Sequence, residues 1–269
     1  MLNDVSWTHR FEIKPKRWVY VPTADCSFQG RELLTQLKRM WIRPEYYYHL
    51  KQGGHVYATK LHLHNVYFAK LDLADFFGSI SRSRITRVLR EFFPYEKARR
   101  LAKMSTLPHG GNSGHSHSLP YGFVQSPMLA SLCLAKSHLG VALEECSKID
   151  EICMTVYMDD ILLSSKSANS LQTWYDNLIM SADRSKFLVN LDKSHGPSNK
   201  TTVFNITLSH MDMKVDEKRF ETFKEEYQKS ENPFQKKGIG AYVGTVSKAQ
   251  ALQLDMSSLP RFITSNLKY

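Results

Sequence analysis

The stretch that decides the fold is ICMTVYMDDILLSS, residues 152–165. Two apolar runs flank a short polar tip, and runs of this kind separated by a tight turn predict a β-hairpin. The tip places Asp159 and Asp160 side by side where the chain turns. Acidic residues are common in turns, because their side chains bond to nearby backbone amides. The pair therefore gains meaning only from the rest of the chain.

A second acidic residue ends another apolar segment upstream. VYFAKLDL, residues 66–73, predicts a strand that ends beside Asp72. Phosphoryl transfer from a nucleoside triphosphate uses two divalent cations about 3.5–4 Å apart, and Mg²⁺ prefers carboxylate oxygens. If the strand and hairpin are neighbours, Asp72, Asp159 and Asp160 predict a Mg²⁺ site, with Mn²⁺ as the alternative ion. Asp75 is the alternative carboxylate, which we interpret as a solvated or capping residue.

Local patterns predict an alternation of strands and helices elsewhere. We expect a strand over 10–22, helices over 29–42 and 81–104 (interrupted near Pro94), one long helix from Ser126 (as its N-cap) and Pro127 to about 145, a helix over 167–185, strands near 187–191 and 201–208, and a helical tail from about 212, broken at Pro233 and around Gly238 and Gly240. This mixture favours an α+β fold with helices packed on one face of an antiparallel sheet.

Composition and charge narrow the class of protein. The chain has 269 residues, 42% hydrophobic and 23% charged, which suits one large or two small soluble domains. Its net charge of +10 favours a nucleic-acid partner, with anionic lipid or a generic basic surface as alternatives. No apolar run approaches the roughly 20 residues of a membrane span, and the N-terminus lacks the apolar segment of a signal peptide. We therefore expect a cytoplasmic protein without membrane contact. Its four cysteines, none in a CxxC pair, are expected to be reduced thiols: Cys26, Cys133, Cys146 and Cys153.

Several motifs together carry a family resemblance. They are RWVYVP (17–22), LDLADFFGSI (71–80), LPYGFVQSPMLASL (119–132), YMDD (157–160), NLDKS (190–194) and VFNITLS (203–209). In this order, across roughly residues 10–210, the chain resembles the reverse transcriptases, and most closely the bacterial retron, group II intron and defence-associated branches. The resemblance implies a right-hand polymerase: fingers over 1–70, to which 105–125 return at the junction with the palm; a palm over 71–211; and a reduced helical thumb over 212–269.

The resemblance also implies roles for individual residues. Asp72 and Asp159 are expected to bind both metal ions, with Asp160 in support, and Lys193 is a candidate general acid or an ordinary surface lysine. Phe77 would stack beneath the sugar and exclude a 2′ hydroxyl, and Arg17, helped by Lys14 and Lys16, would clamp the triphosphate. The nucleotide pocket would comprise Arg17, Lys14, Leu73, Phe77, Tyr121, Gly122 and Gln125, and the strand-binding residues would be Tyr157, Met158, Ser126 and Pro127.

One motif departs from the family pattern. Pro120-Tyr121-Gly122 stands where reverse transcriptases usually have Pro-Gln-Gly, whose Gln touches the incoming nucleotide. Tyr121 and the short thumb motivate one alternative function, untemplated or protein-primed nucleotide transfer. A non-catalytic RNA-binding scaffold is another. The first hypothesis is an RNA-directed DNA polymerase that uses deoxynucleotides, copies a structured non-coding RNA into DNA, and acts against phage; a second copy or a partner protein could complete its grip.

Two further clusters have two interpretations each. The loop histidines His109, His115 and His117 lack zinc-like partners, so we interpret the loop as a solvated segment that touches nucleic acid rather than a metal site. The second cluster mixes aromatic and basic residues, which fits either a strand-binding surface or a half-buried helix end: Arg39, Arg43, Tyr46, Tyr47 and Tyr48.

Overall fold

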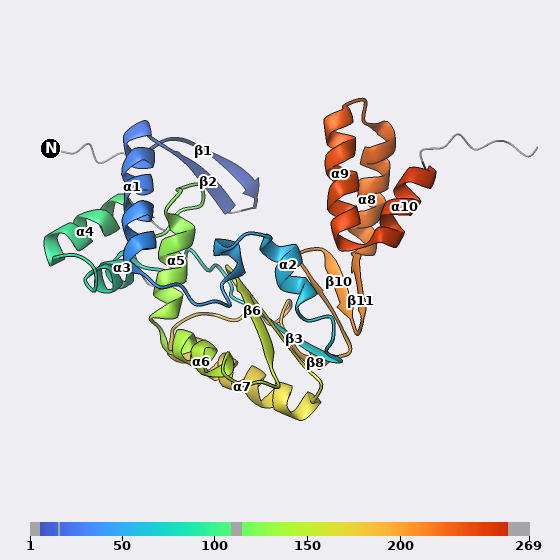
Figure 1. Cartoon of the computed structure of the whole chain (residues 1–269). Coiled ribbons are helices and arrows are strands. Elements are labelled where there is room, and N and C mark those ends of the chain that lie inside the picture. Colours follow the sequence, from blue (N-terminus) through green and yellow to red (C-terminus); the bar gives the residue numbers. More distant parts are fainter. Residues whose placement is uncertain (1–5, 16, 109–114, 258–269) are drawn as a thin grey trace, which may run out of the picture.

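The structure is a computed structural model that describes residues 6–15, 17–108 and 115–257. Helices and short antiparallel strands surround a central four-stranded sheet, which confirms the predicted α+β class (Figure 1). Within the described residues, none of the helices has the length and apolar character needed to cross a bilayer.

The central sheet has the strand order β6-β7-β3-β8, with all neighbours antiparallel. Its strands are β6 (Cys153–Tyr157), β7 (Asp160–Ser165), β3 (Tyr67–Asp72) and β8 (His195–Ser198). The predicted hairpin is therefore confirmed as β6 and β7, joined through Met158 and Asp159, and Met158 adopts a left-handed φ of 61°. Because β3 pairs with β7, Asp72 lies directly opposite Asp160.

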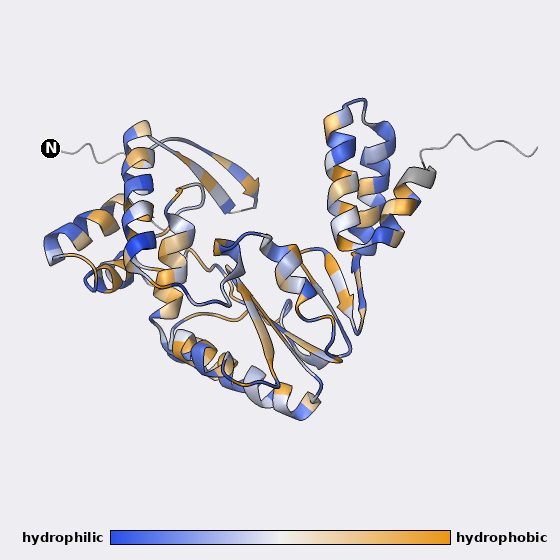
Figure 2. Ribbon diagram, in the orientation of Figure 1, coloured by the Kyte–Doolittle hydropathy of each residue, from blue (hydrophilic) through white to orange (hydrophobic). Residues whose placement is uncertain are grey.

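Both faces of this sheet carry buried side chains, and successive residues of a strand point to opposite faces. Ala69, Leu71 and Ile161 point into the main core, which also contains residues of α7 (Ala168–Arg184). Phe68 and Leu162 point the other way, into a second core shared with the C-terminal strands and helices. Figure 2 shows the apolar colour concentrated on these central strands and on the helix faces turned toward them.

The N-terminal segment differs from the single strand expected over 10–22. It forms a hairpin of β1 (Trp7–Lys14) and β2 (Arg17–Pro22), because Pro15 has no amide hydrogen to continue the ladder. Helix α1 (Ala24–Met40) begins before residue 29, since the Thr23 side chain accepts a hydrogen bond from the Cys26 amide and caps it. A 3₁₀ turn, η1 (Tyr48–Leu50), and helix α2 (Gly54–Lys60) follow.

The next helices confirm one expectation and correct another. α3 (Arg82–Leu89) and α4 (Tyr95–Met104) are separated near Pro94 as expected, and a short pair of strands, β4 (Leu107–Pro108) and β5 (His117–Ser118), follows. The single long helix after Pro127 is wrong. The chain forms α5 (Ser126–Ala135) and α6 (His138–Cys146), because the Ser137 side chain accepts a hydrogen bond from Gly140 N–H and caps a new helix.

The prediction that Ser126 is the N-cap of this helix is also wrong. Ser126 is the first residue of α5, and its buried hydroxyl donates to the Pro120 carbonyl at 2.8 Å. The hydroxyl is therefore used to hold the preceding loop, and the residue before it, Gln125, occupies the cap position.

The C-terminal part contains more strand than expected. β9 (Lys200–Val203), β10 (Ile206–Ser209) and β11 (Asp212–Val215) form a three-stranded antiparallel sheet, so the helical tail begins only at α8 (Glu217–Lys229). No strand forms over 187–191 among the described residues; Val189 makes one isolated bridge to Leu73. α9 (Pro233–Val246) begins at Pro233 and continues unbroken through both glycines, because its buried side chains Ile239 and Val243 pack into the second core. α10 (Lys248–Ser257) ends the described chain.

A buried histidine joins the two hairpin strands and predicts acid sensitivity. His62 is fully buried and bonds to Ser164 at 2.7 Å and Thr155 at 2.9 Å. Burial lowers its pKa to about 3, so the unfolded chain binds an extra proton as pH falls below about 6.5. We expect this residue to make unfolding easier by about 1.4 kcal/mol per pH unit below 6. Urea unfolding at pH 7.5, 6.5 and 5.5 measures the free energy of unfolding at each pH. This free energy should fall less steeply with decreasing pH in His62→Gln than in wild type, whereas exposed His210→Gln should show the wild-type dependence. Equal slopes for His62→Gln and wild type would exclude His62 as the cause.

Candidate active site

Three carboxylates lie where β3 ends and the β6–β7 hairpin turns. Asp72 is the last residue of β3 and is 5% exposed, Asp160 is the first residue of β7, and Asp159 lies in the turn between β6 and β7. The Leu73 amide donates to the Asp159 carbonyl at 2.9 Å, so the end of β3 is joined directly to the turn. The Asp72 carbonyl accepts from the Asn190 amide at 2.8 Å. Backbone contacts on both sides therefore fix the position of Asp72.

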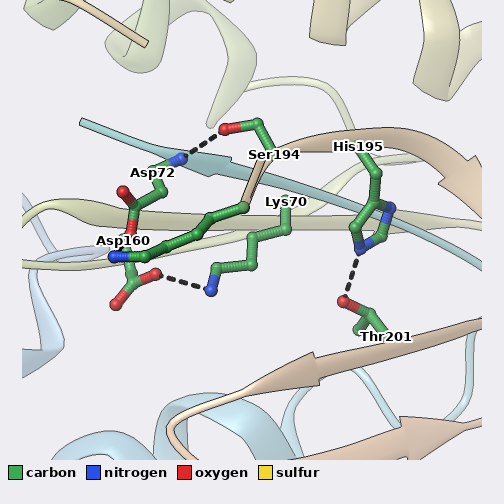
Figure 3. A network of polar contacts seen from close by, with 7 residues as sticks. Lys70, Asp72, Asp160, Ser194, His195 and Thr201 are labelled. Atoms are coloured by element: carbon green, nitrogen blue, oxygen red, sulfur yellow. Dashed lines mark hydrogen bonds and ion pairs between the residues drawn. The ribbon is translucent and has the colours of Figure 1, made fainter. Parts of the chain in front are cut away.

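Two lysines contact this cluster, and one of them was not predicted. Lys70 lies two residues before Asp72 on the same face of β3, diagonal to Asp160, and its Nζ is 3.0 Å from Asp160 Oδ1 (Figure 3). The two-residue spacing of Lys70 and Asp72 in the sequence AKLD indicates that both side chains lie on the same face of the strand. Lys193, the predicted acid, places Nζ 3.7 Å from Asp72 Oδ2, with 62% of its side chain exposed. Its neighbour Ser194 accepts a hydrogen bond from the Asp72 amide at 2.9 Å.

The carboxylates are crowded electrostatically. Burial raises the pKa of Asp159, and the negative charges of Asp160 and Asp72 raise it further, while Arg17 opposes the shift. Burial also raises the pKa of Asp160, against the opposing effect of Lys70. Raised values mean that the ionised forms are destabilised in the absence of a cation. A divalent cation at this place would relieve that repulsion.

The donor atoms present fit a hard divalent cation. Within the described residues, no group of three or more His, Cys, Asp or Glu side chains is already arranged to hold a metal ion. Asp160 contacts Lys70 instead, and Asp72 contacts Lys193. The donor set is nevertheless all carboxylate, which is the ligand type of Mg²⁺ and Mn²⁺. The predicted ligands are thus adjacent, and their assignment to a metal stays a prediction.

Three residues expected at the nucleotide pocket contact one another beside the carboxylates. Arg17 of β2 donates a hydrogen bond to the Tyr121 hydroxyl at 2.8 Å, and its guanidinium lies 4.7 Å from the centre of the same ring. The Tyr121 ring in turn lies 4.8 Å from that of Phe77. Since Arg17 also lowers the pKa of Asp159, its positive charge acts at the carboxylate cluster. The structure therefore places Arg17, Tyr121 and Phe77 together.

Glycine is needed at position 122 for a structural reason, in addition to the expected close approach of a nucleotide. Its φ is +100°, and an added Cβ would lie 2.2 Å from the Tyr20 carbonyl oxygen. The Tyr20 amide donates to the Tyr121 carbonyl at 2.9 Å. Glycine is thus needed for β2 to pack against the loop that carries Tyr121.

The remaining predicted pocket residues occupy diverse positions. Leu73 and Gln125 are buried: the Leu73 amide contributes the contact to Asp159, and the Gln125 amide bonds to Ser105 beside α1. Lys14 is exposed at the end of β1, opposite Arg17. Pro127 is half-buried in the first turn of α5. The side chain of Gln125 is therefore packed between α1 and Ser105, and no local sequence pattern indicates this packing.

The other candidate clusters are resolved in part. Tyr46 is 8% exposed and Tyr47 is fully buried, whereas Tyr48 is half-buried. Arg39 and Arg43 are exposed, so the cluster is partly core and partly surface. His115 contacts the Gly78 carbonyl through Nε2 at 2.6 Å, whereas His109 and Lys16 lie outside the described residues. All four cysteines are free thiols.

Sequence reasoning missed an aromatic cluster that connects distant segments. The His55 ring of α2 lies 5.9 Å from Tyr157 of β6, 5.4 Å from Phe204 of the β9–β10 turn and 6.0 Å from Tyr242 of α9. Tyr157 and Phe204 also contact each other at 5.0 Å. No periodic pattern connects these positions, because they meet only through the tertiary fold.

Comparisons with known proteins point in one direction. The family model described as "Reverse transcriptase (RNA-dependent DNA polymerase)" matches residues 16–221. A solved structure of telomerase from Candida albicans with a fragment of telomeric RNA has a TM-score of 0.53 at 10% identity, covering 87% of this chain and 48% of that one. A foamy viral protease-reverse transcriptase bound to double-stranded DNA has a TM-score of 0.47 at 16% identity, covering 86% and 34%. A comparison with curated protein sequences gave no match.

The similarity to the solved structures covers only part of each of those chains. The chain spans between about a third and a half of the solved chains that it resembles. At these identities the telomerase likeness concerns the fold. The family match, in contrast, covers the strand end, the hairpin and the segment that carries Lys193.

Proposed function

The chain belongs to the reverse transcriptase (RNA-dependent DNA polymerase) family, and from this premise we propose that it adds deoxynucleotides to a 3′ hydroxyl under the direction of an RNA template. The observation that carries the proposal is the register of β3 against β7, which puts Asp72 opposite Asp160 and next to Asp159. Such carboxylates supply the ligands of a two-metal phosphoryl transfer.

Each residue of the site has a proposed task. Asp72 and Asp159 would bind both Mg²⁺ ions, with Mn²⁺ as the alternative, and Asp160 would support them. When bound, the metal ions would activate the 3′ hydroxyl and neutralise the leaving pyrophosphate. Arg17 would hold the triphosphate by paired hydrogen bonds. Lys193, exposed beside Asp72, would donate a proton to the pyrophosphate.

The finer biological assignment rests on motif resemblance and on charge. We propose fingers over 1–70 with 105–125, a palm over 71–211 and a reduced thumb over 212–269. The motifs suit a bacterial retron, group II intron or defence-associated enzyme that works in the cytoplasm against phage. The net charge of +10 supports a structured non-coding RNA as template and partner. DNA would be the product, and a second copy or a partner protein would complete the grip of the short thumb.

A second function is favoured by one observation. Tyr121 stands where the family has glutamine, and its hydroxyl is already bonded to Arg17. A ring in this position would stack on a base without reading its edge. This favours untemplated or protein-primed addition. A non-catalytic RNA scaffold is the third candidate, and the three acidic residues disfavour it.

Labelled dNTP incorporation by the purified protein with its co-purified RNA and Mg²⁺ tests the proposal. We expect incorporation that is lost after RNase treatment and that yields DNA complementary to the RNA. Incorporation that survives RNase, with product that matches no template, would favour untemplated synthesis. A label that stays on the protein after phenol extraction would indicate protein priming. No incorporation with any primer or metal would contradict the proposal and favour the scaffold.

A further inference from the structure

The outer edge of β6 has an unusual partner. β6 is the edge strand of the central sheet, so its outward amides need acceptors from elsewhere. The Val156 amide donates to the Tyr46 carbonyl at 2.8 Å. Two residues further on, the Met158 amide donates to Nδ1 of His49 at 3.1 Å. Tyr47 therefore forms an isolated parallel bridge with β6, and the imidazole of His49, in the following 3₁₀ turn, supplies the next acceptor.

The hydrogen bonds of His49 determine which ring nitrogen carries its proton. Nδ1 accepts from an amide, so it carries no hydrogen. Nε2 is 2.6 Å from the Ser131 hydroxyl of α5, and that hydroxyl donates to the Pro127 carbonyl at 2.8 Å. The Ser131 oxygen must therefore accept from Nε2–H. Burial lowers the pKa of His49 to about 4, against the opposing effect of the Val156 backbone, which keeps the ring neutral as this network requires.

The hydrogen bond between His49 and Met158 lies next to the carboxylate cluster. Met158 is the residue with a left-handed φ of 61°, a conformation that costs energy for a side chain of this size. It immediately precedes Asp159, whose carbonyl holds the end of β3. The network therefore runs from the first turns of α5 through His49 to the strained residue of the catalytic turn.

We propose that His49 is a positioning residue that holds the Met158–Asp159 turn in the geometry needed for metal-dependent nucleotide addition, by accepting the Met158 amide at Nδ1. The inference rests on the proposed polymerase function. His49 touches no reacting group; it acts through the backbone of the turn. Residues of this kind behind a metal site typically change activity by 10–100-fold when replaced.

Two substitutions of His49 distinguish the contribution of the Nδ1 acceptor from that of the rest of the imidazole ring. Asn places an oxygen near the position of Nδ1, whereas Gln places its amide near the position of Nε2. We expect His49→Asn to keep kcat within about threefold of wild type, and His49→Gln to lower kcat roughly tenfold and raise the Mg²⁺ concentration for half-maximal rate. The apparent KM for RNA should change little. Ser131→Ala, which removes the acceptor of Nε2–H, should fall between the two.

If His49 only stabilised the fold, the rates of the variants would follow a different pattern. Equal rates for His49→Asn and His49→Gln, or rate losses that follow losses in melting temperature, would overturn the proposal. A second readout needs no activity: NMR of protein labelled with ¹⁵N-histidine, with the His49 signal identified by its absence in His49→Asn. We expect the Nε2–H neutral form, unchanged between pH 7.5 and 5.5, and an Nδ1–H form would overturn the inference. A wild-type protein without polymerase activity would contradict the proposed function, yet this spectrum would still decide the network.

Discussion

Asp159→Asn should lower the rate of deoxynucleotide addition by roughly 10³-fold or more, because loss of the proposed metal ligand would remove several kcal/mol of transition-state stabilisation. The substitution keeps the size and hydrogen-bonding shape of the side chain but removes the negative charge. Single-nucleotide incorporation under saturating dNTP and Mg²⁺ measures the effect directly.

Stability separates this outcome from misfolding. The pKa of Asp159 is raised in the fold, so its ionised form weakens folding at neutral pH, and the stability that its protonation favours is lost as pH rises. The Asn variant should therefore unfold at the same or higher urea concentration than wild type at pH 7.5. Asp75→Asn is the matched control, since Asp75 is exposed and its φ of 43° suits asparagine. A comparable loss of activity in that control would assign a metal role to Asp75.

Phe77→Val should open the site to ribonucleotides. Phe77 is 5% exposed and its ring packs 4.8 Å from Tyr121, so truncation creates room beside that ring. The proposed role of Phe77 is to exclude a 2′ hydroxyl from this room. We expect the ratio of kcat/KM for dNTP over rNTP to fall roughly 100-fold, mainly through a gain in rNTP use.

Phe76→Val removes the same volume from a neighbouring position. The Phe76 ring packs 5.8 Å from Phe187, in the main core. This control should lower stability without changing sugar selection. Should both variants discriminate as wild type does, another residue must exclude the 2′ hydroxyl.

The sequence predicted those features that depend on short-range patterns. The hairpin around Met158 and the strand before Asp72 were readable because apolar runs and turn residues lie next to one another in the chain. The register that makes Asp72 face Asp160 was an expectation only, since strand pairing is a long-range property. Lys70 was overlooked although its spacing from Asp72 implied a shared face.

Other errors have identifiable physical causes. The apolar pattern runs on across residue 136, so periodicity alone could not show that Ser137 caps a second helix. Gln125 was assigned to the pocket from its motif, but its side chain is buried against Gly30 of α1, at a distance no local pattern encodes. His49 was missed for the same reason: its partners, Met158 and Ser131, lie far along the chain.

The rings around His55 have a mechanical consequence. Tyr242 belongs to α9, and its hydroxyl lies 3.4 Å from His55 Nε2, while Tyr157 on the other side of His55 lies two residues before Asp159. Outward rotation of the C-terminal helices would separate these rings and remove packing from the β6–β7 turn. His55 therefore makes the position of α9 and the position of that turn mechanically interdependent.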